Sequence, residues 1–426
     1  MSLHWNMAVI DEQLRPTAPS SVALIERRMR VLALDGDENA CVASVRSLKC
    51  AGYRVVVGAT RKLSKAGVSH YCDRTFVYTS PQKSSTAFAA EVATEAAREP
   101  GTLIIAHTES TTVALSMHRD LLLGSGARMV MPAPECLSCA IDKVQTTALA
   151  KSLGLAVPES HVMTGPEQAR EAADSMRYPA VLKASRSAEI RANGTIARTA
   201  RPQYACNADE CVMAYRRLAQ NCSSVLAQEL VQGRGAGYFV LMNHGELRAE
   251  FAHVRVRDVH PTGSGSAVRL SVRPLPAVRD GALRILRALD YHGVAMVEFR
   301  ITPENVPVFL EVNPRFWNSL ALSIHAGVDF PALLAHMAEY GDVEPQSEYR
   351  IGVRCRWLVG DFGHFLQVLK GKPKGFPGDF PPRLPTLWAF LRPVPGTYHD
   401  LFSFRDPLPE AADWLHYFWK LINGLV

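Results

Sequence analysis

The sequence predicts a mixed α/β and α+β protein made of several units, and three observations lead to this prediction. Residues 30–115 alternate buried strand patterns with helix patterns, which favours a small parallel sheet. From residue 224 onward, strand patterns follow one another with few helix signals, which indicates antiparallel structure. The chain has 426 residues, of which 47% are hydrophobic and 21% are charged, so it can form two or three domains with cores of their own.

The N-terminal part is expected to be an extension, residues 1–28, followed by a small parallel α/β domain, residues 29–118. Its first strand is MRVLALDG, its first helix ends at Gly52, and RVVVGAT is a second strand. The loop after the first strand reads Asp-Gly-Asp-Glu-Asn and not G-x-G-x-x-G. The sequence therefore lacks the dinucleotide-binding fingerprint of a Rossmann oxidoreductase.

The middle of the chain, residues 119–331, is expected to form one domain of two subdomains, 119–200 and 201–331. A connecting helix (AIDKVQTTALAKSLG) precedes the strand YPAVLKAS and the polar loop RSAEIRANGTI. A helix (DECVMAYRRLAQ) then leads to the strand SVLAQELV and to long strand patterns. Residues 332–426, with a Pro/Gly/Lys linker and a final helix, are expected to be an accessory region.

The most informative stretch is residues 294–313, where two strand patterns each carry a glutamate. VAMVEFRI and VPVFLEVN flank the turn sequence Thr-Pro-Glu-Asn, which predicts a β-hairpin. Because side chains alternate between the faces of a strand, Glu298, Glu311 and Asn313 are expected on one face. Two buried carboxylates need a cation, and together with an amide oxygen they favour Mg²⁺ over zinc. The alternative is that the glutamates pair with Arg300 or Arg315.

Charge, cysteines and hydropathy exclude several classes of protein. The net charge of +6 is spread along the chain without a basic arm or a zinc-finger spacing, so no nucleic-acid partner is expected. No apolar run is long enough for a membrane span, and no signal peptide precedes the first strand. Nine scattered cysteines are typical of a reducing compartment, so a cytoplasmic location is expected.

Four segments in order resemble the ATP-grasp superfamily of carboxylate–amine ligases. They are PAPECLSCAIDK, AVLKAS, LAQELVQGRGAGYFV and the hairpin with its continuation EVNPRFW. The resemblance covers residues 30–331 and is most specific in the hairpin. It implies a two-subdomain ATP-grasp fold that binds ATP between the subdomains with Mg²⁺, for which Mn²⁺ can substitute.

The resemblance also assigns roles to individual residues. It implies nucleotide binding by Lys143, Lys183, Ser187, Gly194, Glu229, Leu230 and Val231, and metal binding by Glu298, Glu311 and Asn313. In the family two lysines hold the phosphates, a mobile loop covers them, and the hinge at residues 228–231 meets the adenine edge. The family's acid for the ribose hydroxyls has no counterpart in residues 233–238, so ribose recognition is unassigned.

Arginines are the expected residues for the reacting groups. Arg315 follows the Asn313-Pro314 pair, and the resemblance implies that it clamps the transferred phosphoryl group, a bidentate task that suits arginine. The stretch 249–273 carries further candidates, namely Arg269 as a catalytic residue and His253, Arg255, Arg257, Ser264 and Arg273 as substrate-binding residues. Several arginines aimed at one cavity would suit an acidic substrate. The alternative is a solvated polar strand face.

The implied activity is an ATP-dependent carboxylate–amine ligase that forms an amide through an acyl phosphate and releases ADP and phosphate. The alternatives are an ATP-dependent carboxylase, another phosphoryl-transferring enzyme, and a catalytically silent nucleotide-binding protein. The expected partners are a small carboxylate and a small amine. A homodimer is left open.

The last stretch of the chain, EAADWLHYFWKLINGLV, has the apolar spacing of an amphipathic helix. One interpretation is that this helix packs back onto the body or a sister subunit. The other is peripheral membrane contact through its aromatic face and the upstream lysines Lys370, Lys372 and Lys374.

Overall fold

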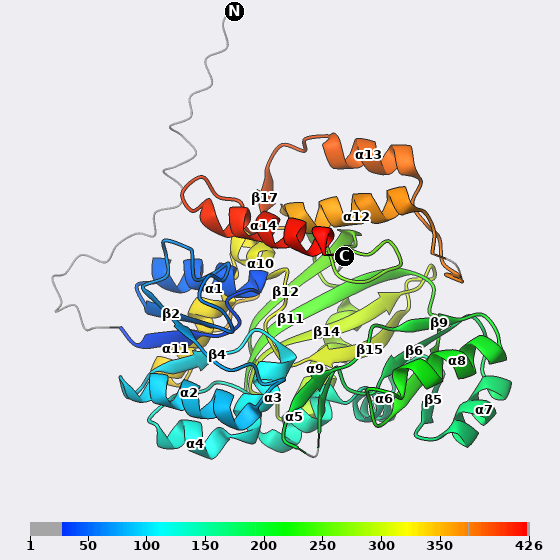
Figure 1. Cartoon of the computed structure of the whole chain (residues 1–426), viewed down its shortest axis with the longest axis horizontal. Coiled ribbons are helices and arrows are strands. Elements are labelled where there is room, and N and C mark those ends of the chain that lie inside the picture. The colour runs from blue at the N-terminus through cyan, green and yellow to red at the C-terminus, as the bar shows by residue number, and fades with distance from the viewer. Residues whose placement is uncertain (1–27, 192, 374, 424–426) are drawn as a thin grey trace, which may run out of the picture.

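The computed structural model describes residues 28–426 except residues 192, 374 and 424–426. The expected extension therefore lies outside the described residues apart from Arg28, as does Lys374 of the linker. The described residues form two four-stranded sheets, a seven-stranded sheet and a two-stranded hairpin, and Figure 1 shows the C-terminal helices on the outside.

The first unit is a four-stranded parallel sheet in the order β3-β2-β1-β4. Its strands are β1 (Arg30–Ala33), β2 (Arg54–Ala59), β3 (Arg74–Val77) and β4 (Leu103–Ile105), and its helices are α1 (Asn39–Cys50), α2 (Ser85–Ala97), α3 (Glu109–Met117) and α4 (Arg119–Gly124). Strands β1 and β4 are buried along their whole length, as expected for a parallel sheet covered on both faces. α1 ends just before Gly52, whose φ of +89° suits glycine. The predicted parallel sheet is confirmed.

The second unit is a four-stranded antiparallel sheet in the order β5-β10-β6-β9. Its elements are β5 (Ser160–Met163), α7 (Pro166–Ser175), β6 (Ala180–Ala184), β9 (Gln203–Ala205), α8 (Ala208–Leu218) and β10 (Val225–Glu229). Its small core lies between the sheet and the two helices. The short hairpin β7 (Ala188–Ile190) with β8 (Ile196–Arg198) projects from it, and α5 (Pro134–Ile141) and α6 (Lys143–Ser152) connect it to the first unit.

The third unit is a seven-stranded sheet in the order β15-β14-β11-β12-β13-β16-β17, antiparallel except for its last pair. Its strands are β11 (Arg234–Asn243), β12 (Glu246–Arg257), β13 (Val268–Ser271), β14 (Gly293–Ile301), β15 (Pro307–Asn313), β16 (Arg354–Arg356) and β17 (Thr397–His399). Its helices are α9 (Pro276–Ala288), α10 (Leu320–Ala326), α11 (Phe330–Tyr340), α12 (Leu358–Lys370), α13 (Arg383–Leu391) and α14 (Leu408–Ile422). The predicted hairpin is confirmed as β14 and β15.

The two faces of this sheet pack differently. One face, with α9 and α6, forms a core of its own. The other face shares a core with the first unit, because Phe251 and Trp317 join one cluster with Val45 and Leu48 of α1. The first unit is therefore packed directly against the large sheet.

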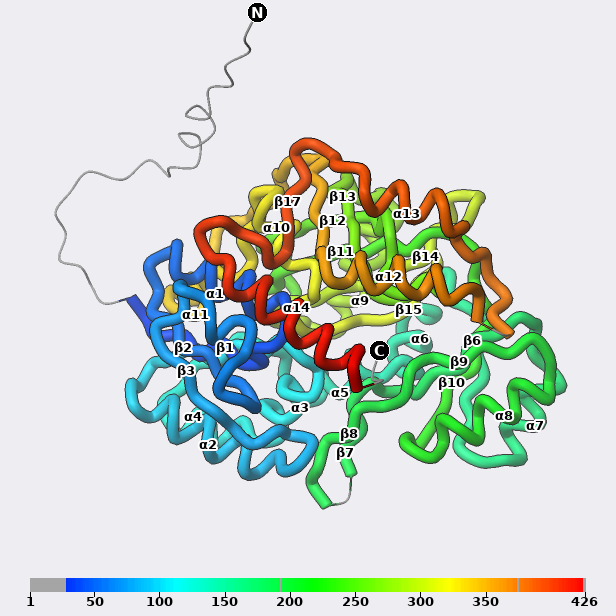
Figure 2. The backbone as a smooth tube through the Cα atoms, turned by 45° about the horizontal axis from the view of Figure 1, so that its top comes forward, coloured from blue at the N-terminus to red at the C-terminus, as the bar shows by residue number. Residues whose placement is uncertain are grey.

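The C-terminal region is joined to the sheet by strands as well as by helices. β16 pairs with β13, and β17 extends the edge. α14 lies between the first unit and α12 (Figure 2), where Asp413 pairs with Lys65 at 3.0 Å and accepts a 2.6 Å hydrogen bond from Trp357. Among the described residues no single helix is long and apolar enough to cross a bilayer. α10 and α11 together reach the length and apolar composition of a membrane span, but the chain bends by 86° between them.

Candidate active site

The hairpin places its two glutamates directly opposite each other. Glu298 of β14 is the register partner of Glu311 of β15, and a β-bulge at Leu310 follows this pair. Asn313 Nδ2 lies 3.4 Å from Glu298 Oε1 and 3.2 Å from Glu311 Oε1. The structure thus brings the three predicted metal ligands together. Like charges directly opposite on a sheet are unfavourable unless a cation lies between or beside them.

Cationic side chains already border this pair. Arg255 Nη2 lies 2.7 Å from Glu298 Oε2, and Lys143 Nζ lies 3.4 Å from Glu311 Oε2. The expected alternative partners, Arg300 and Arg315, form neither of these pairs. Burial would raise the pKa of Glu311, but the nearby ammonium groups and the Asn313 amide outweigh it and lower that pKa. Glu311 is therefore held ionised, and carboxylate oxygens are the hard donors that Mg²⁺ prefers. Within the described residues no group of three or more His, Cys, Asp or Glu side chains has an arrangement that could hold a metal ion, so the predicted set consists of two carboxylates and an amide.

Two lysines from different units converge near the glutamates. Lys143 begins α6, where Asp142 caps the helix, and its Nζ also lies 2.9 Å from Ser187 Oγ. Lys183 of β6 forms no hydrogen bond or ion pair with any described residue. Burial lowers its pKa to about 8, against the opposing effect of Glu311. A largely buried ammonium group without a direct partner suits an anionic ligand such as a phosphate.

The predicted phosphate-covering loop, residues 185–195, is the β7–β8 hairpin and its approach. Gly194 takes a φ of +75° at the turn, and its carbonyl accepts a 2.6 Å hydrogen bond from Ser85 of α2. Ser187, also in this loop, accepts the hydrogen bond from Lys143. The structure brings Ser187 to the site, whereas Gly194 anchors the hairpin to the first unit.

The predicted adenine hinge lies apart from the glutamates. Glu229 Oε1 accepts a hydrogen bond from Glu159 N at 3.2 Å, and Leu230 N donates to the Pro179 carbonyl at 3.0 Å. The Leu230 N–H is thus already used within the protein. This corrects the expectation that the amide N–H of Leu230 is available to read a base, and leaves the Leu230 carbonyl and the Val231 backbone as the candidates.

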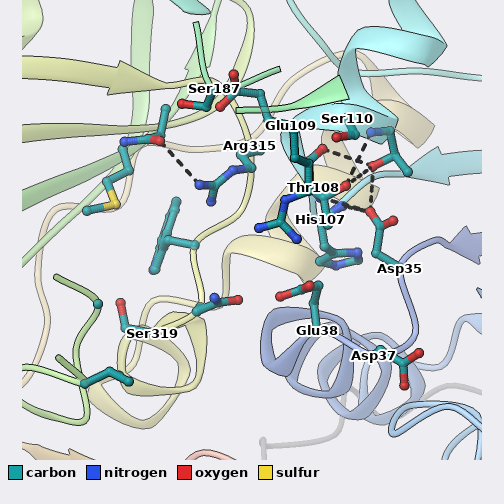
Figure 3. Close-up of a pocket in the computed structure, with 18 of the residues that line it drawn as sticks. Asp35, Asp37, Glu38, His107, Thr108, Glu109, Ser110, Ser187, Arg315 and Ser319 are labelled. Atoms are coloured by element: carbon teal, nitrogen blue, oxygen red, sulfur yellow. Dashed lines mark hydrogen bonds between the residues drawn. The ribbon is translucent and has the colours of Figure 1, made fainter. Parts of the chain in front are cut away.

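A cavity of about 650 Å³ opens between the first unit and the large sheet. From the sheet side it is lined by His253, Arg255, Met296, Glu298, Glu311, Asn313, Arg315, Trp317, Asn318 and Ser319, and from the first unit by Asp35, Asp37, Glu38, Thr60, Tyr78, His107, Thr108, Glu109, Ser110 and Thr111. Figure 3 shows Arg315 across the cavity from Glu38 and Asp35. The first-unit residues follow the carboxyl ends of β1, β2, β3 and β4.

Sequence reasoning missed this wall of the cavity. Polar residues directly after buried parallel strands, Asp35-Gly-Asp-Glu after β1 and His107-Thr-Glu-Ser after β4, are the signal that could have found it. Asp35 organises the wall, because its carboxylate accepts hydrogen bonds from the amides of His107 and Thr108, both at 2.9 Å, and from Thr111 Oγ1 at 2.6 Å.

The predicted substrate residues divide into two groups. His253 and Arg255 line the cavity, with His253 Nε2 2.8 Å from Ser319 Oγ. Ser264 is exposed and does not line it, although the adjacent Gly265 and Ser266 do. Arg273 is exposed on the surface.

Two further predicted arginines serve the architecture. Arg269 has no exposed surface and pairs with Asp400, with Nη1 2.7 Å from Oδ2. Arg257 pairs with the buried Asp361 at 2.5 Å. This corrects the assignment of a catalytic role to Arg269 and a substrate role to Arg257, because both guanidinium groups neutralise carboxylates of the C-terminal region.

Arg315 lies beside the set of predicted metal ligands. Its Nη2 donates to Asn313 Oδ1 at 3.3 Å and its Nη1 to the Phe316 carbonyl at 2.9 Å, and no carboxylate pairs with it among the residues that the structure describes. The guanidinium faces the cavity next to the metal-ligand set (Figure 3).

The chain is similar to known proteins in sequence and in fold. Residues 223–360 match the family model described as "ATP-grasp in the biosynthetic pathway with Ter operon". The chain is 24% identical over 238 residues to the carbamoyl phosphate synthase large chain of Pyrococcus furiosus. This similarity involves 53% of this chain but only 22% of that protein, so the chain spans about a fifth of this relative's length.

Solved structures resemble the chain over about three quarters of its length. The biotin carboxylase domain of 2-oxoglutarate carboxylase from Hydrogenobacter thermophilus, solved with MgADP and bicarbonate, has a TM-score of 0.61 at 14% identity and matches 76% of this chain and 73% of its own. An L-amino acid ligase from Bacillus licheniformis has a TM-score of 0.57 at 14% identity, with 75% and 76% of the two chains matched. These similarities establish the fold.

Proposed function

Because this chain has the fold of the ATP-grasp superfamily, we propose that it is an ATP-dependent carboxylate–amine ligase. One observation supports this most: Glu298 and Glu311 face each other beside Asn313, at the point where Lys143 and the unpaired Lys183 converge. Two carboxylates, an amide and two ammonium groups match what a metal–triphosphate complex needs.

We assign the residues as follows. Lys143, Lys183 and Ser187 hold phosphate oxygens, and the Leu230 carbonyl and the Val231 backbone are the candidates for base recognition. Glu298, Glu311 and Asn313 hold Mg²⁺, which when bound neutralises charge on the phosphates. Arg315 stabilises the transferred phosphoryl group by bidentate hydrogen bonds.

The reaction has two steps. An oxygen of the substrate carboxylate forms a bond to the γ-phosphorus of ATP, and the bond to the bridging oxygen breaks, so that ADP leaves. The amine nitrogen then attacks the acyl carbon, the carbon–oxygen bond to phosphate breaks, and phosphate carries away one proton of the nitrogen. No side chain forms a covalent bond in this scheme, so the protein contributes positioning and electrostatic stabilisation.

The experiment that tests this proposal is an ADP-release screen with Mg-ATP and pairs of small carboxylates and amines. We expect ADP release to depend on both partners, and the product mass to equal the summed masses minus one water. ADP release that depends on bicarbonate without an amine would identify a carboxylase, the rival that the bicarbonate-bound relative suggests. Tight ATP binding without turnover on any pair would indicate a silent nucleotide-binding protein.

We propose a lipid surface as a further partner, at the outer face of the C-terminal helices. Leu415 and Ile422 of α14 are 73% and 85% exposed, and Leu384 and Trp388 of α13 are 78% and 68% exposed. Exposed apolar side chains near basic residues such as Lys420 are typical of peripheral membrane helices. Co-sedimentation with anionic vesicles should fall in a Leu415→Ser, Ile422→Ser variant, whereas a dimer lost in the same variant would identify a self-association face.

A further inference from the structure

Two carboxylates on the first-unit wall of the cavity are incompletely satisfied: Glu38 has no side-chain partner, and Glu109, although the Ala188 amide donates to its carboxylate, keeps one oxygen free. Glu38 occupies the N-cap position of α1, but its side chain does not cap the helix. The Glu38 carboxylate forms no hydrogen bond or ion pair with any described residue. Glu109 begins α3, and its Oε1 is buried without a hydrogen-bond partner. Asp37, by comparison, is held by Arg61 through both oxygens.

Glu38 and Asp37 also differ in the direction of their side chains. Glu38 points toward the open centre of the cavity, whereas Asp37 points away from it (Figure 3). Burial raises the pKa of both Glu38 and Glu109. Lys65 opposes this effect at Glu38, and Lys143 and Arg315 oppose it at Glu109, but none of these cations forms an ion pair with either carboxylate. These are carboxylates that a bound cation would complement.

A second observation indicates that this space accepts a polar ligand. Trp317 and His253 are 2% and 1% exposed and line the same cavity, and Trp317 Nε1 and His253 Nδ1 have no hydrogen-bond partners. Unsatisfied buried polar atoms are uncommon in native proteins. The cavity volume of about 650 Å³ leaves room for a small molecule beside the phosphoryl-transfer residues.

The charges of the cavity are divided between its walls. Arg255 and Arg315 stand on the sheet side with the metal ligands, Arg198 enters from the β7–β8 hairpin, and Glu38 and Glu109 stand on the first-unit side. A substrate carboxylate is therefore favoured near Arg315, and a cation near Glu38.

We propose that Glu38 and Glu109 bind the ammonium group of the amine substrate, which makes this substrate a primary aliphatic amine that is cationic at neutral pH. The inference rests on the proposed ligase function. The ammonium gives one proton to a glutamate, and its nitrogen lone pair then forms the carbon–nitrogen bond as phosphate leaves. The nucleophile is therefore a compound with an aliphatic ammonium group, such as an amino acid or a diamine.

The test uses two nucleophiles of different charge with the full-length protein, Mg-ATP and a panel of carboxylates. Hydroxylamine is neutral near pH 7.5 and traps an acyl phosphate as a hydroxamate, so it needs no ammonium site. L-alanine, L-lysine and 1,4-diaminobutane are cationic at their amines. Absence of ADP release and of hydroxamate with every carboxylate would overturn the ligase function itself.

If hydroxamate forms, the variants Glu38→Gln and Glu109→Gln decide the inference. We expect the KM for the accepted cationic amine to rise roughly ten- to hundredfold, as for the loss of a charged hydrogen bond, and hydroxamate formation to stay within about twofold. Asp37→Asn is the matched control, because that carboxylate lies on the same wall but points away from the cavity. This variant should change neither the KM for the amine nor the rate of hydroxamate formation. An unchanged KM in both glutamate variants would overturn the inference, as would an equal loss of both activities.

A measurement on the unmodified protein covers the case in which the variants do not fold. In the presence of MgADP, 1,4-diaminobutane should raise the melting temperature, and the isosteric neutral 1,4-butanediol should not. Equal effects of the two compounds would contradict an ammonium site.

Discussion

At the scale of single residues, the guanidinium groups of β12 and β13 show how one residue type serves two purposes. Arg255 reaches the cavity and meets Glu298, whereas Arg257, two positions later on the same strand, meets Asp361. A pattern of alternating arginines predicts a shared face, but it cannot reveal which acid from elsewhere in the chain arrives there. Asp361 is 104 residues from its arginine in sequence, and Asp400 is 131 residues from Arg269.

We expect Arg269→Ala to destabilise the protein without a specific effect on substrate binding. Removing one member of a fully buried ion pair leaves Asp400 uncompensated, which costs about 3–5 kcal/mol of the free energy of unfolding. Urea unfolding would measure it. The matched control is the exposed Arg273→Ala, which should shift the free energy of unfolding by no more than about 0.5 kcal/mol. A stable Arg269→Ala protein with lost turnover would restore the catalytic assignment.

For Glu311→Gln we expect the opposite result, lost turnover in a folded protein. The substitution keeps the shape of the side chain but removes charge from the metal-ligand set, so ADP release should fall about a hundredfold or more and should require more Mg²⁺. Glu304→Gln, on the exposed turn of the same hairpin, is the control and should leave the rate unchanged. Full activity of Glu311→Gln would show that Glu311 is not part of the active site.

At the scale of elements, α14 carries a buried acid that makes its docking depend on pH. Burial and the neighbouring Asp413 raise the pKa of Glu410 to about 7, while Trp414 Nε1 donates a 2.7 Å hydrogen bond to it. A carboxyl group whose pKa is higher in the folded than in the unfolded state stabilises the fold below its unfolded pKa of about 4.5, and this stability is lost as pH rises through about 7.

We therefore expect Glu410→Gln to gain stability relative to the wild type between pH 5 and pH 8. The gain should be on the order of 2 kcal/mol at the upper end, because the amide needs no ionisation in the buried site. Melting temperatures across this pH range would measure it, with the exposed Glu135→Gln as a control that leaves the profile unchanged. A pH-independent difference between variant and wild type would show that Glu410 does not titrate in this range.

Elements with a repeating pattern were predictable, and irregular features were not. Alternation in VAMVEFRI and VPVFLEVN places Glu298, Glu311 and Asn313 on one face, and the structure brings them together. The bulge at Leu310 cannot be predicted from the apolar pattern, although it lies directly beside the paired glutamates. The pairing of β16 with β13 was also missed, because three-residue strands are too short to show a period.

At the scale of the whole molecule, the cavity exists only because two units meet. Its sheet wall comes from residues 253–319 and its other wall from residues 35–111. The sequence predicted each unit, but the way the strand ends of the first unit face the hairpin is a property of their packing. That packing is extensive, because α1 shares a core with α10 and α11 and Arg46 pairs with Asp406 near α14.

We expect this shared core to make the described part of the chain unfold as one cooperative unit. The tryptophans at 317, 357, 388, 414 and 419 all lie outside the first unit, so their fluorescence follows the large sheet and the C-terminal region. Cys41 of α1 is fully buried in the first unit, and burial raises the pKa of its thiol, so it should react with a thiol reagent only after that unit opens. In urea, the midpoint of Cys41 labelling, read by peptide mass, should coincide with the fluorescence midpoint, and the exposed Cys50 should label throughout. Labelling of Cys41 at a clearly lower urea concentration would mean that the first unit opens alone, and that the cavity between it and the sheet can form and disappear within the native state.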